Sequence, residues 1–432
     1  MVDAFTTLCD VLLSMAERPH LPPTTSAMAL EHPLPPGMRD LLPEEAATRR
    51  ELSRALIDRF SLHGYRLVTP PAFELASVLE RGLGSSAADD LMRFIEPESG
   101  EVAVLRPDMT PQVARIVATR LGDREPPFRL AYEGTVVRRR ASRAKKHRQI
   151  PQVGVELCGV AGAEGDLELL CLAADVMREG AGLEHFTIDV SDAGIVRELL
   201  ADVSSARAAE ISRALARKDE PSLEELCDGL VEGPRVVALA RLHGGRDAIG
   251  SAVELLAGSR AEAPARRLLA LFDAASARGL GPYLSADPGE VRGFSYYTGT
   301  IFSIYAEGPG EAVGGGGRYD DLLARYGAPR PAVGLGLDID ALAWAVRTAC
   351  ATPPRRTGVV VVGPENDPRV LELRGRGVAA VAVADAPRAH AYAASWSFAY
   401  VWDDTAERKT TIDDVLRVLK SDPGSSASRT RK

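Results

Sequence analysis

Apolar residues recur at helical spacing near the start of the interpretable sequence and then alternate in short runs. Pro43 opens a segment in which Leu52, Leu56 and Phe60 share one face, and Gly64 ends it, which predicts a helix. Apolar runs predict strands over residues 65–68, 92–95, 102–105, 128–137 and 152–158. Helical spacing returns over residues 111–121 and 167–177. Together these elements predict an α+β region.

The middle of the chain changes character. Residues 194–290 are rich in Ala, Leu, Arg and Glu at helical spacing, which predicts an all-helical insertion. Residues 291–350 return to a strand over 302–305 and end in a helix that begins near Asp338. The insertion therefore interrupts one core, made of residues 33–193 and 291–350.

Apolar runs also alternate with helical patterns near the C-terminus. Runs over residues 359–362, 379–383 and 398–402 have the rhythm of a parallel sheet, which predicts a small α/β domain over residues 357–420. Residues 1–32 have weak periodicity and residues 421–432 are rich in Ser, so both segments are predicted to be disordered. A short helix packed on the body is the alternative for residues 1–32.

Composition narrows the class of protein. The 432 residues are 45% apolar and 26% charged, with a net charge of −8, which argues weakly against a protein held to nucleic acid by overall positive charge. No apolar run predicts a transmembrane helix, and the run over residues 8–15 is too polar for a secretion signal. The five cysteines are widely spread, so we expect no zinc site, no disulfide framework and no cofactor, and a cytoplasmic location.

Two stretches carry polar residues that suit a polar binding site. Asp108 and Thr110 lie between a predicted strand and helix, where a carboxylate suits an ammonium group, although either residue could simply cap the helix. Gln152, Gly154 and Glu156 alternate along a strand, so they share one face. That face is either exposed to solvent or the floor of a polar site.

A basic loop joins two of the predicted strands. Residues 133–150 contain five Arg and two Lys against one Glu, a local charge of +6 within an acidic protein. Arg138 and Arg148 are the candidate anion-binding residues. A solvated hairpin tip is the alternative.

A further polar stretch contains Arg292, Tyr296 and Tyr297, and four consecutive glycines follow at residues 314–317. Glycine allows another backbone or a ligand to approach closely. The glycine run matches neither the dinucleotide-binding fingerprint nor the P-loop, so a glycine-rich hairpin without a ligand is the alternative.

These motifs, in this order, resemble those of histidyl-tRNA synthetase and its paralogues, over residues 34–346. The stretch from Pro35 to Pro43 is typical of that family, and residues 64–70 look like its dimer-forming first motif. The resemblance implies a class II aminoacyl-tRNA synthetase-like core, an antiparallel sheet with flanking helices, and self-association through the class II dimer interface.

The resemblance also implies a set of histidine-binding residues. Asp108 stands where the synthetases usually have Glu, and Phe294 and Ser295 depart from the family motif around Arg292. The implied binding residues are Asp108 and Thr110 for the ammonium group, Glu156 or Tyr297 for an imidazole N–H, and Gln152 and Arg292 for the carboxylate side.

Other departures bear on ATP and tRNA. The synthetases bind the γ-phosphate of ATP through an Arg in their third motif, and this chain has Asp338 and Asp340 there instead. Arg140 replaces a Glu of the second motif, and the C-terminal domain is shorter and less basic than an anticodon-binding domain. Removing a cation and adding carboxylates opposes triphosphate binding. Amino-acid activation is therefore expected to be lost.

A retained histidine site with a damaged ATP site is similar to the regulatory subunits of ATP phosphoribosyltransferase. That resemblance implies a non-catalytic partner of a short-form catalytic subunit, in a hetero-oligomer that performs the first step of histidine biosynthesis. It implies histidine as the feedback ligand and no nucleic-acid partner. An active histidyl-tRNA synthetase and an RNA-binding paralogue are the alternatives.

Overall fold

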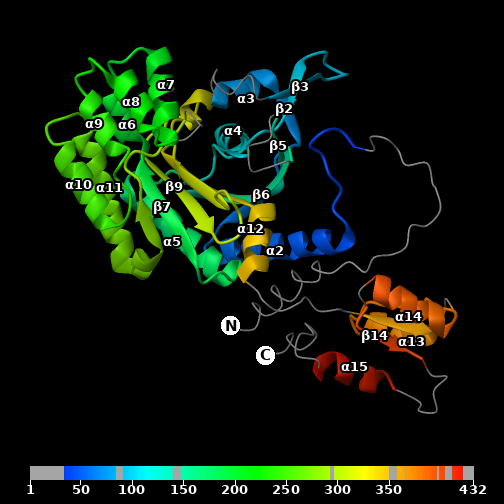
Figure 1. Ribbon diagram of the computed structural model, residues 1–432. Helices are drawn as coiled ribbons and strands as arrows, with labels where there is room; N and C mark the ends of the chain where they lie inside the picture. Colours follow the sequence, from blue (N-terminus) through cyan, green and yellow to red (C-terminus); the bar gives the residue numbers. More distant parts are fainter. Residues whose placement is uncertain are drawn as a thin grey trace. The chain divides into compact units, whose positions relative to one another are not determined.

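The computed structural model describes residues 34–83, 91–139, 147–291, 296–349, 358–364, 366–396, 398–403 and 411–421 (Figure 1). Residues 49–349 belong to one compact unit and residues 350–432 to another. The two segments predicted to be disordered, 1–32 and 421–432, lie outside the described residues except for Ser421. Each unit is considered by itself below.

An eight-stranded sheet forms the centre of the larger unit. Its order is β1 (Arg66–Val68), β5 (Phe128–Val137), β6 (Gln149–Cys158), β11 (Ala332–Asp338), β10 (Gly314–Arg318), β9 (Thr300–Ala306), β7 (Phe186–Asp192) and β8 (Leu284–Ala286). The neighbours from β5 to β7 are antiparallel, and the edge strands β1 and β8 pair in parallel. The predicted antiparallel sheet is therefore present, and the glycine run lies in it as strand β10.

Helices pack on this sheet through the apolar residues that predicted them. Helix α2 (Pro43–Leu62) ends before Gly64, whose φ is +83°, and Leu52, Leu56 and Phe60 are fully buried. Helices α5 (Ala163–Asp175) and α12 (Ile339–Ala349) pack against β11 and β6. A short helical segment, η2 (Val176–Gly180), continues α5. The predicted helices are confirmed with small shifts of their ends.

A small antiparallel sheet stands beside the main one. It consists of β2 (Phe73–Leu75), β4 (Val102–Leu105) and β3 (Met92–Ile95), with helices α3 (Ala76–Leu83) and α4 (Thr110–Arg120) packed next to it. The predicted hairpin of β3 and β4 is confirmed residue for residue. Strand β2 has no alternating pattern of its own and was not predicted.

The segment predicted to be a helical insertion contains mainly helices. They are α6 (Ala193–Leu199), α7 (Ser205–Ala216), α8 (Glu220–Cys227), α9 (Gly233–Leu239), α10 (Arg246–Leu255) and α11 (Glu262–Ala275), followed by η3 (Ser276–Leu280) and η4 (Gly281–Tyr283). The prediction of an all-helical segment up to residue 290 is wrong at its end, where β8 pairs with β7. A three-residue strand at a sheet edge is too short to show a periodicity.

The smaller unit is an α/β fold. Strands β12 (Val359–Val362), β13 (Ala380–Val383) and β14 (Tyr400–Trp402) are parallel in the order β13-β12-β14, with helices α13 (Pro368–Gly375), α14 (Ala386–Ser395) and α15 (Ile412–Ser421). Val359, Val360 and Val361 are fully buried, as continuous apolar strands require. Among the described residues of both units, no helix is long and apolar enough to span a membrane.

Candidate functional site

Strand β6 carries the centre of the candidate site. Gln152, Gly154 and Glu156 alternate with Val153 and Val155, so they lie on one face of the sheet, called here the site face. The two valines point to the opposite face and are fully buried.

Glycines of β11 and β10 continue the site face beside Glu156. Gly334 lies opposite Glu156, and Gly317 lies opposite Gly334 on the next strand. A Cβ at Gly334 would overlap Oε2 of Glu156, and a Cβ at Gly317 would lie 2.9 Å from the ring of Tyr297. Glycine is required here because side chains of the site rest directly on the strand backbone.

Glu156 is buried among hydroxyl groups. Its side chain is only 1% exposed; Thr110 Oγ1 donates to Oε1 at 2.6 Å, and the Tyr319 hydroxyl donates to Oε2. Burial raises the pKa of Glu156 to about 8, helped by the nearby negative charge of Asp108 and opposed by the two hydroxyl donors. A ligand that brings an N–H donor or a positive charge would favour the ionised form.

Asp108 is the second buried carboxyl of the site. One oxygen accepts from the backbone N–H of Met109 at 2.8 Å, and the other accepts from the Tyr296 hydroxyl at 2.8 Å. The first contact lies just before α4, whose N-cap is Met109 and not Asp108 or Thr110, while the second ties Asp108 to the tyrosines. Asp108, Glu156, Tyr296 and Tyr319 are called here the acid–tyrosine cluster.

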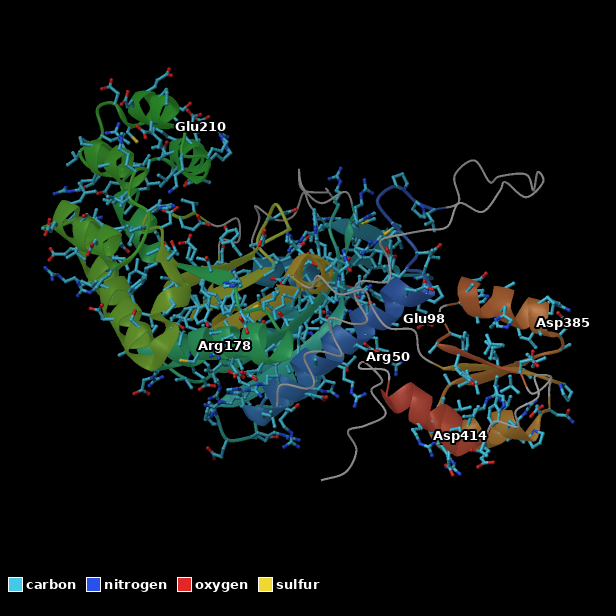
Figure 2. All side chains as sticks on the ribbon, turned by 60° about the horizontal axis from the view of Figure 1, so that its bottom comes forward. Arg50, Glu98, Arg178, Glu210, Asp385 and Asp414 are labelled. Carbon is cyan, nitrogen blue, oxygen red and sulfur yellow. The ribbon has the colours of Figure 1, made fainter. Side chains whose placement is uncertain are left out.

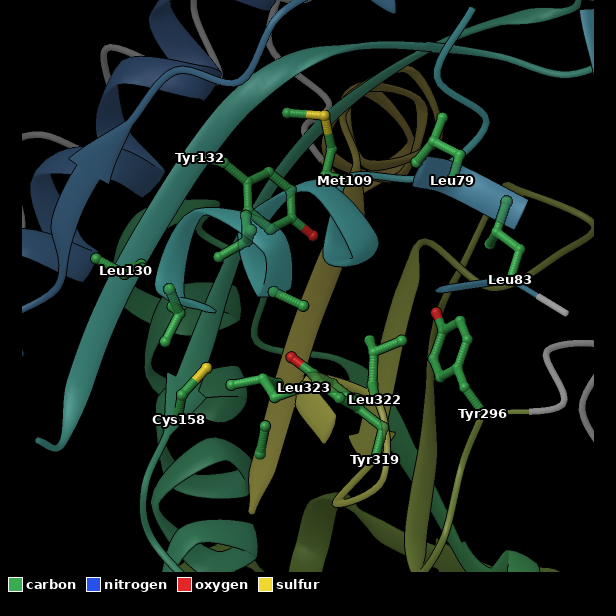
Figure 3. Packing of buried hydrophobic residues seen from close by; sticks show 14 of the residues in the cluster. Leu79, Leu83, Met109, Leu130, Tyr132, Cys158, Tyr296, Tyr319, Leu322 and Leu323 are labelled. Atoms are coloured by element: carbon green, nitrogen blue, oxygen red, sulfur yellow. The ribbon is translucent and has the colours of Figure 1, made fainter. Parts of the chain in front are cut away.

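Three tyrosine rings lie near these two acids, and Figure 3 shows Tyr132, Tyr296 and Tyr319 among the buried apolar residues. The ring centroids of Tyr296 and Tyr319 lie 5.8 Å apart in an edge-on contact, and those of Tyr296 and Tyr297 lie 4.8 Å apart. Tyr132 on β5 lies over Gly154, where a Cβ would overlap its ring. Burial raises the pKa of Tyr132, Tyr296 and Tyr319 well above the ordinary value, so all three remain neutral donors.

Sequence reasoning did not single out Tyr132 or Tyr319. A usable signal was present for both residues. Tyr132 occupies an alternating position on a strand that pairs with β6, opposite Gly154, and Tyr319 follows the glycine run directly. Assigning Tyr132 to the site required the strand register, which only the structure supplies.

The remaining predicted histidine-binding residues are Gln152, Tyr297 and Arg292. The amide oxygen of Gln152 is buried and has no hydrogen-bond partner. Tyr297 is half-buried over Gly317. Arg292 lies outside the described residues. The structure therefore brings Asp108, Thr110 and Glu156 together, with Tyr297 close by and an unfilled acceptor on Gln152.

The candidate anion-binding residues lie at the far ends of β5 and β6. The backbone N–H of Arg138 donates to the carbonyl of Arg148 at 3.0 Å, and the backbone N–H of Arg148 donates to the carbonyl of Gly37 at 2.8 Å. The side-chain stem of Arg148 lies against Gly37. Residues 140–146 of the basic loop lie outside the described part of the chain, and an anion-binding role stays a prediction.

The two carboxylates of the third motif have internal partners. Asp338 Oδ1 accepts from the backbone N–H groups of Asp340 and Ala341 at 2.9 and 3.1 Å, which caps the start of α12. Asp340 pairs with Arg39 at 2.5 Å. Burial raises the pKa of Asp340, and the positive charge of Arg39 opposes that rise. Both carboxylates of this stretch are thus engaged by the protein itself.

Within the ranges that the structure describes, no group of three or more His, Cys, Asp or Glu residues is arranged to hold a metal ion. The three described cysteines, Cys158, Cys171 and Cys227, are free thiols.

Comparisons with known proteins agree with this arrangement. A family model described as histidyl-tRNA synthetase matches residues 37–342. A protein of Moorella thermoacetica named ATP phosphoribosyltransferase regulatory subunit is 39% identical over 357 residues, which cover 81% of this chain and 91% of that protein. A protein of the same name from Anaeromyxobacter sp. (strain K) is 42% identical over 320 residues, covering 72% and 90% of the two chains.

Solved structures show the same likeness. A Bacillus halodurans structure described as an ATP phosphoribosyltransferase regulatory subunit/histidyl-tRNA synthetase superposes with a TM-score of 0.74 at 29% identity, covering 88% of this chain and 99% of that one. Histidyl-tRNA synthetase from Nostoc sp. PCC 7120 superposes with a TM-score of 0.68 at 18% identity, covering 85% and 90%. The second likeness bears on the fold alone.

Proposed function

The chain belongs to the ATP phosphoribosyltransferase regulatory subunits, a family with the histidyl-tRNA synthetase fold, and we propose that it is the non-catalytic partner of a catalytic phosphoribosyltransferase subunit. The family resemblance and the fold class predicted from the sequence are both confirmed. The proposal places the chain in the first step of histidine biosynthesis, in a hetero-oligomer with a short-form catalytic subunit, and in the cytoplasm. Self-association through the class II dimer interface, whose first motif is residues 64–70, forms part of this proposal.

The acid–tyrosine cluster is the observation that carries the proposed ligand, histidine. Histidine offers an ammonium group and an imidazole N–H, and the site offers Asp108, Glu156 and the unfilled oxygen of Gln152 as acceptors. Of these acceptors only the Gln152 oxygen is without a partner, and a buried acceptor without a partner costs free energy that a donor of the ligand would recover. We assign the ammonium group to Asp108 and Thr110, and an imidazole nitrogen to Glu156 or Tyr297.

The third motif supports a regulatory role over catalysis. Adenylation needs the triphosphate of ATP bound beside the amino acid, and Asp338 and Asp340 place negative charge in that stretch. Like charges in a partly buried site oppose binding. We therefore assign no catalytic residue to this chain.

Histidine can regulate the partner only if it binds one state of the assembly better than another. In the proposed account the unliganded chain supports the catalytic subunit, and the liganded chain restrains it. The coupling operates through binding free energy, so the catalytic subunit in its active state must weaken histidine binding by the same factor.

The proposal is tested by reconstitution with a short-form ATP phosphoribosyltransferase that lacks a regulatory domain. We expect the two chains to co-purify, the catalytic rate to rise when this chain is added, and calorimetry to detect histidine binding to this chain. ATP–pyrophosphate exchange with histidine is expected to be absent. Exchange activity without any effect on the phosphoribosyltransferase would instead identify an active histidyl-tRNA synthetase and contradict the proposal.

A further inference from the structure

Arg106 is a buried cation at the edge of the site. The residue is 8% exposed and lies just after β4, two positions before Asp108. Its Nε donates to the carbonyl of Thr135 at 2.8 Å, and its Nη1 donates to the carbonyls of Pro70 and Pro71 at 2.9 and 3.2 Å. These three bonds hold the guanidinium in one orientation.

The contacts of Arg106 leave part of its binding capacity unused. A guanidinium has five N–H donors, and the three bonds account for those of Nε and Nη1 but not for the two of Nη2. All three acceptors are neutral carbonyls, and no carboxylate of the described residues forms an ion pair with Arg106. A buried charge without a counter-ion is costly, so an anionic ligand would recover free energy at this position.

Nη2 of Arg106 lies on the site face. It rests on Gly134 of β5 so closely that a Cβ at Gly134 would overlap it. Gly134 lies directly opposite Gln152 in the register of β5 and β6, and side chains at opposite positions of an antiparallel pair stand about 5 Å apart. The donors of Arg106 Nη2 therefore lie over the strand position opposite Gln152, whose amide oxygen has no hydrogen-bond partner.

We propose that Arg106 is a ligand-binding residue whose Nη2 recognises the α-carboxylate of the amino acid, beside the ammonium group assigned above to Asp108 and Thr110, with the oxygen of Gln152 as a further acceptor. This inference rests on the proposed histidine site and adds the residue that binds the acidic end of the ligand. An α-amino acid carries an ammonium group and a carboxylate on one carbon. The site offers a matching pair, the oxygen of Gln152 as an acceptor and Nη2 of Arg106, over the opposite strand position, as a donor. A charge-assisted hydrogen bond to a fixed guanidinium selects for that carboxylate.

The competing role for Arg106 is a purely structural one, in which it only holds the turn at Pro70 and Pro71. A structural residue would affect every ligand of the site equally. A carboxylate-binding residue affects only ligands that carry the carboxylate. L-Histidinol keeps the imidazole and ammonium groups of L-histidine and has a CH2OH group in place of the carboxylate, so the pair of ligands separates the two roles.

The test is calorimetry of the full chain with L-histidine and with L-histidinol. We expect the wild-type protein to bind histidine about tenfold to a hundredfold more tightly than histidinol, as a hydrogen bond to a charged group implies. In Arg106→Gln this ratio is expected to fall close to one, with histidinol binding almost unchanged. Gly134→Ala, whose methyl group would displace Nη2 and leave the arginine in place, is expected to lower the same ratio.

Gly122→Ala is the matched control, because a Cβ at Gly122 meets no atom within 4 Å. An equal loss of both ligands in a folded Arg106→Gln or Gly134→Ala variant would overturn the role of Arg106 while the histidine site stands. Equal binding of the two ligands by the wild-type protein would overturn it as well. No binding of either ligand by the wild-type protein would overturn the histidine site itself, and this inference with it.

Discussion

Glu156 is a buried carboxyl with a second carboxyl, Asp108, nearby, and this predicts an unusual pH dependence of stability. Because the folded state raises its pKa to about 8, the native protein holds a proton that the unfolded chain releases near pH 4 to 5. Stability therefore falls as pH rises between those two pKa values, by up to about 1.4 kcal/mol per pH unit. Glu156→Gln removes this loss. The free energy of unfolding of the variant should therefore rise relative to that of the wild-type protein from pH 5 to pH 8.

Urea unfolding of both proteins across that pH range measures the effect. Glu98→Gln is a suitable control, because Glu98 lies exposed in the turn after β3 (Figure 2). If the wild-type protein and Glu156→Gln change in parallel with pH, Glu156 is ionised in the folded state and the description of its surroundings is wrong.

Gly334 gives a second prediction at the scale of one residue. A methyl group there would overlap Oε2 of Glu156 and lie 3.0 Å from the Tyr319 hydroxyl, so Gly334→Ala should destabilise the protein by about 1 to 3 kcal/mol and abolish histidine binding. Gly250→Ala, in helix α10 with no atom within 4 Å, should be neutral or slightly stabilising. Chemical denaturation and calorimetry check both. A Gly334→Ala variant as stable as the wild-type protein would contradict the packing described here.

Single residues of the site were predictable where a polar residue type occurs at a spacing that a strand or a helix start places on one face. Gln152 and Glu156 share a face because strands alternate, and Asp108 and Thr110 approach them because a helix begins there. Arg106 and Tyr132 were not predicted, because their roles depend on Gly134 and Gly154 lying beneath them. Strand register and the fit of a side chain over a glycine have no signature in a single sequence.

At the scale of elements, a buried ion pair joins helix α5 to strand β10. Arg318 contacts Asp166 at 2.7 Å, both side chains are less than 10% exposed, and Thr300 also donates to Asp166. Arg318→Met would leave Asp166 as an uncompensated buried charge, and we expect a loss of about 3 to 5 kcal/mol in the free energy of unfolding. Arg246→Met, which breaks an exposed pair with Asp273, is the control and should cost less than 1 kcal/mol. Similar losses in the two variants would show that the Asp166 pair is not structurally important.

Helices and strands were predicted correctly where they are long enough for their hydrophobic periodicity to be recognised. Helix α2 and strands β3, β4 and β5 have the limits that their apolar residues indicated. Strands β2 and β8 were missed because three residues cannot establish an alternation, and each is held by pairing with a longer strand. Pairing with a neighbouring strand determines whether such a short segment is a strand, and the local β-propensity of its residues does not.

At the scale of the whole molecule, the chain has the histidyl-tRNA synthetase fold, with buried acids on the site face and two carboxylates at the start of α12. In the proposed function these two features separate ligand binding from adenylation. Sequence reasoning reached this account through the order of several motifs, whereas composition alone only argued weakly against nucleic acid. The account is one of regulation, so it must be tested in the presence of a catalytic partner.

Inhibition of the reconstituted phosphoribosyltransferase by histidine tests the central claim most directly. We expect histidine to inhibit the complex that contains the wild-type chain, and Glu156→Gln to raise the histidine concentration for half-inhibition at least tenfold while activation in the absence of histidine persists. Glu98→Gln should leave the inhibition curve unchanged. An identical inhibition curve for the wild-type and Glu156→Gln complexes would contradict the claim that histidine acts through this site.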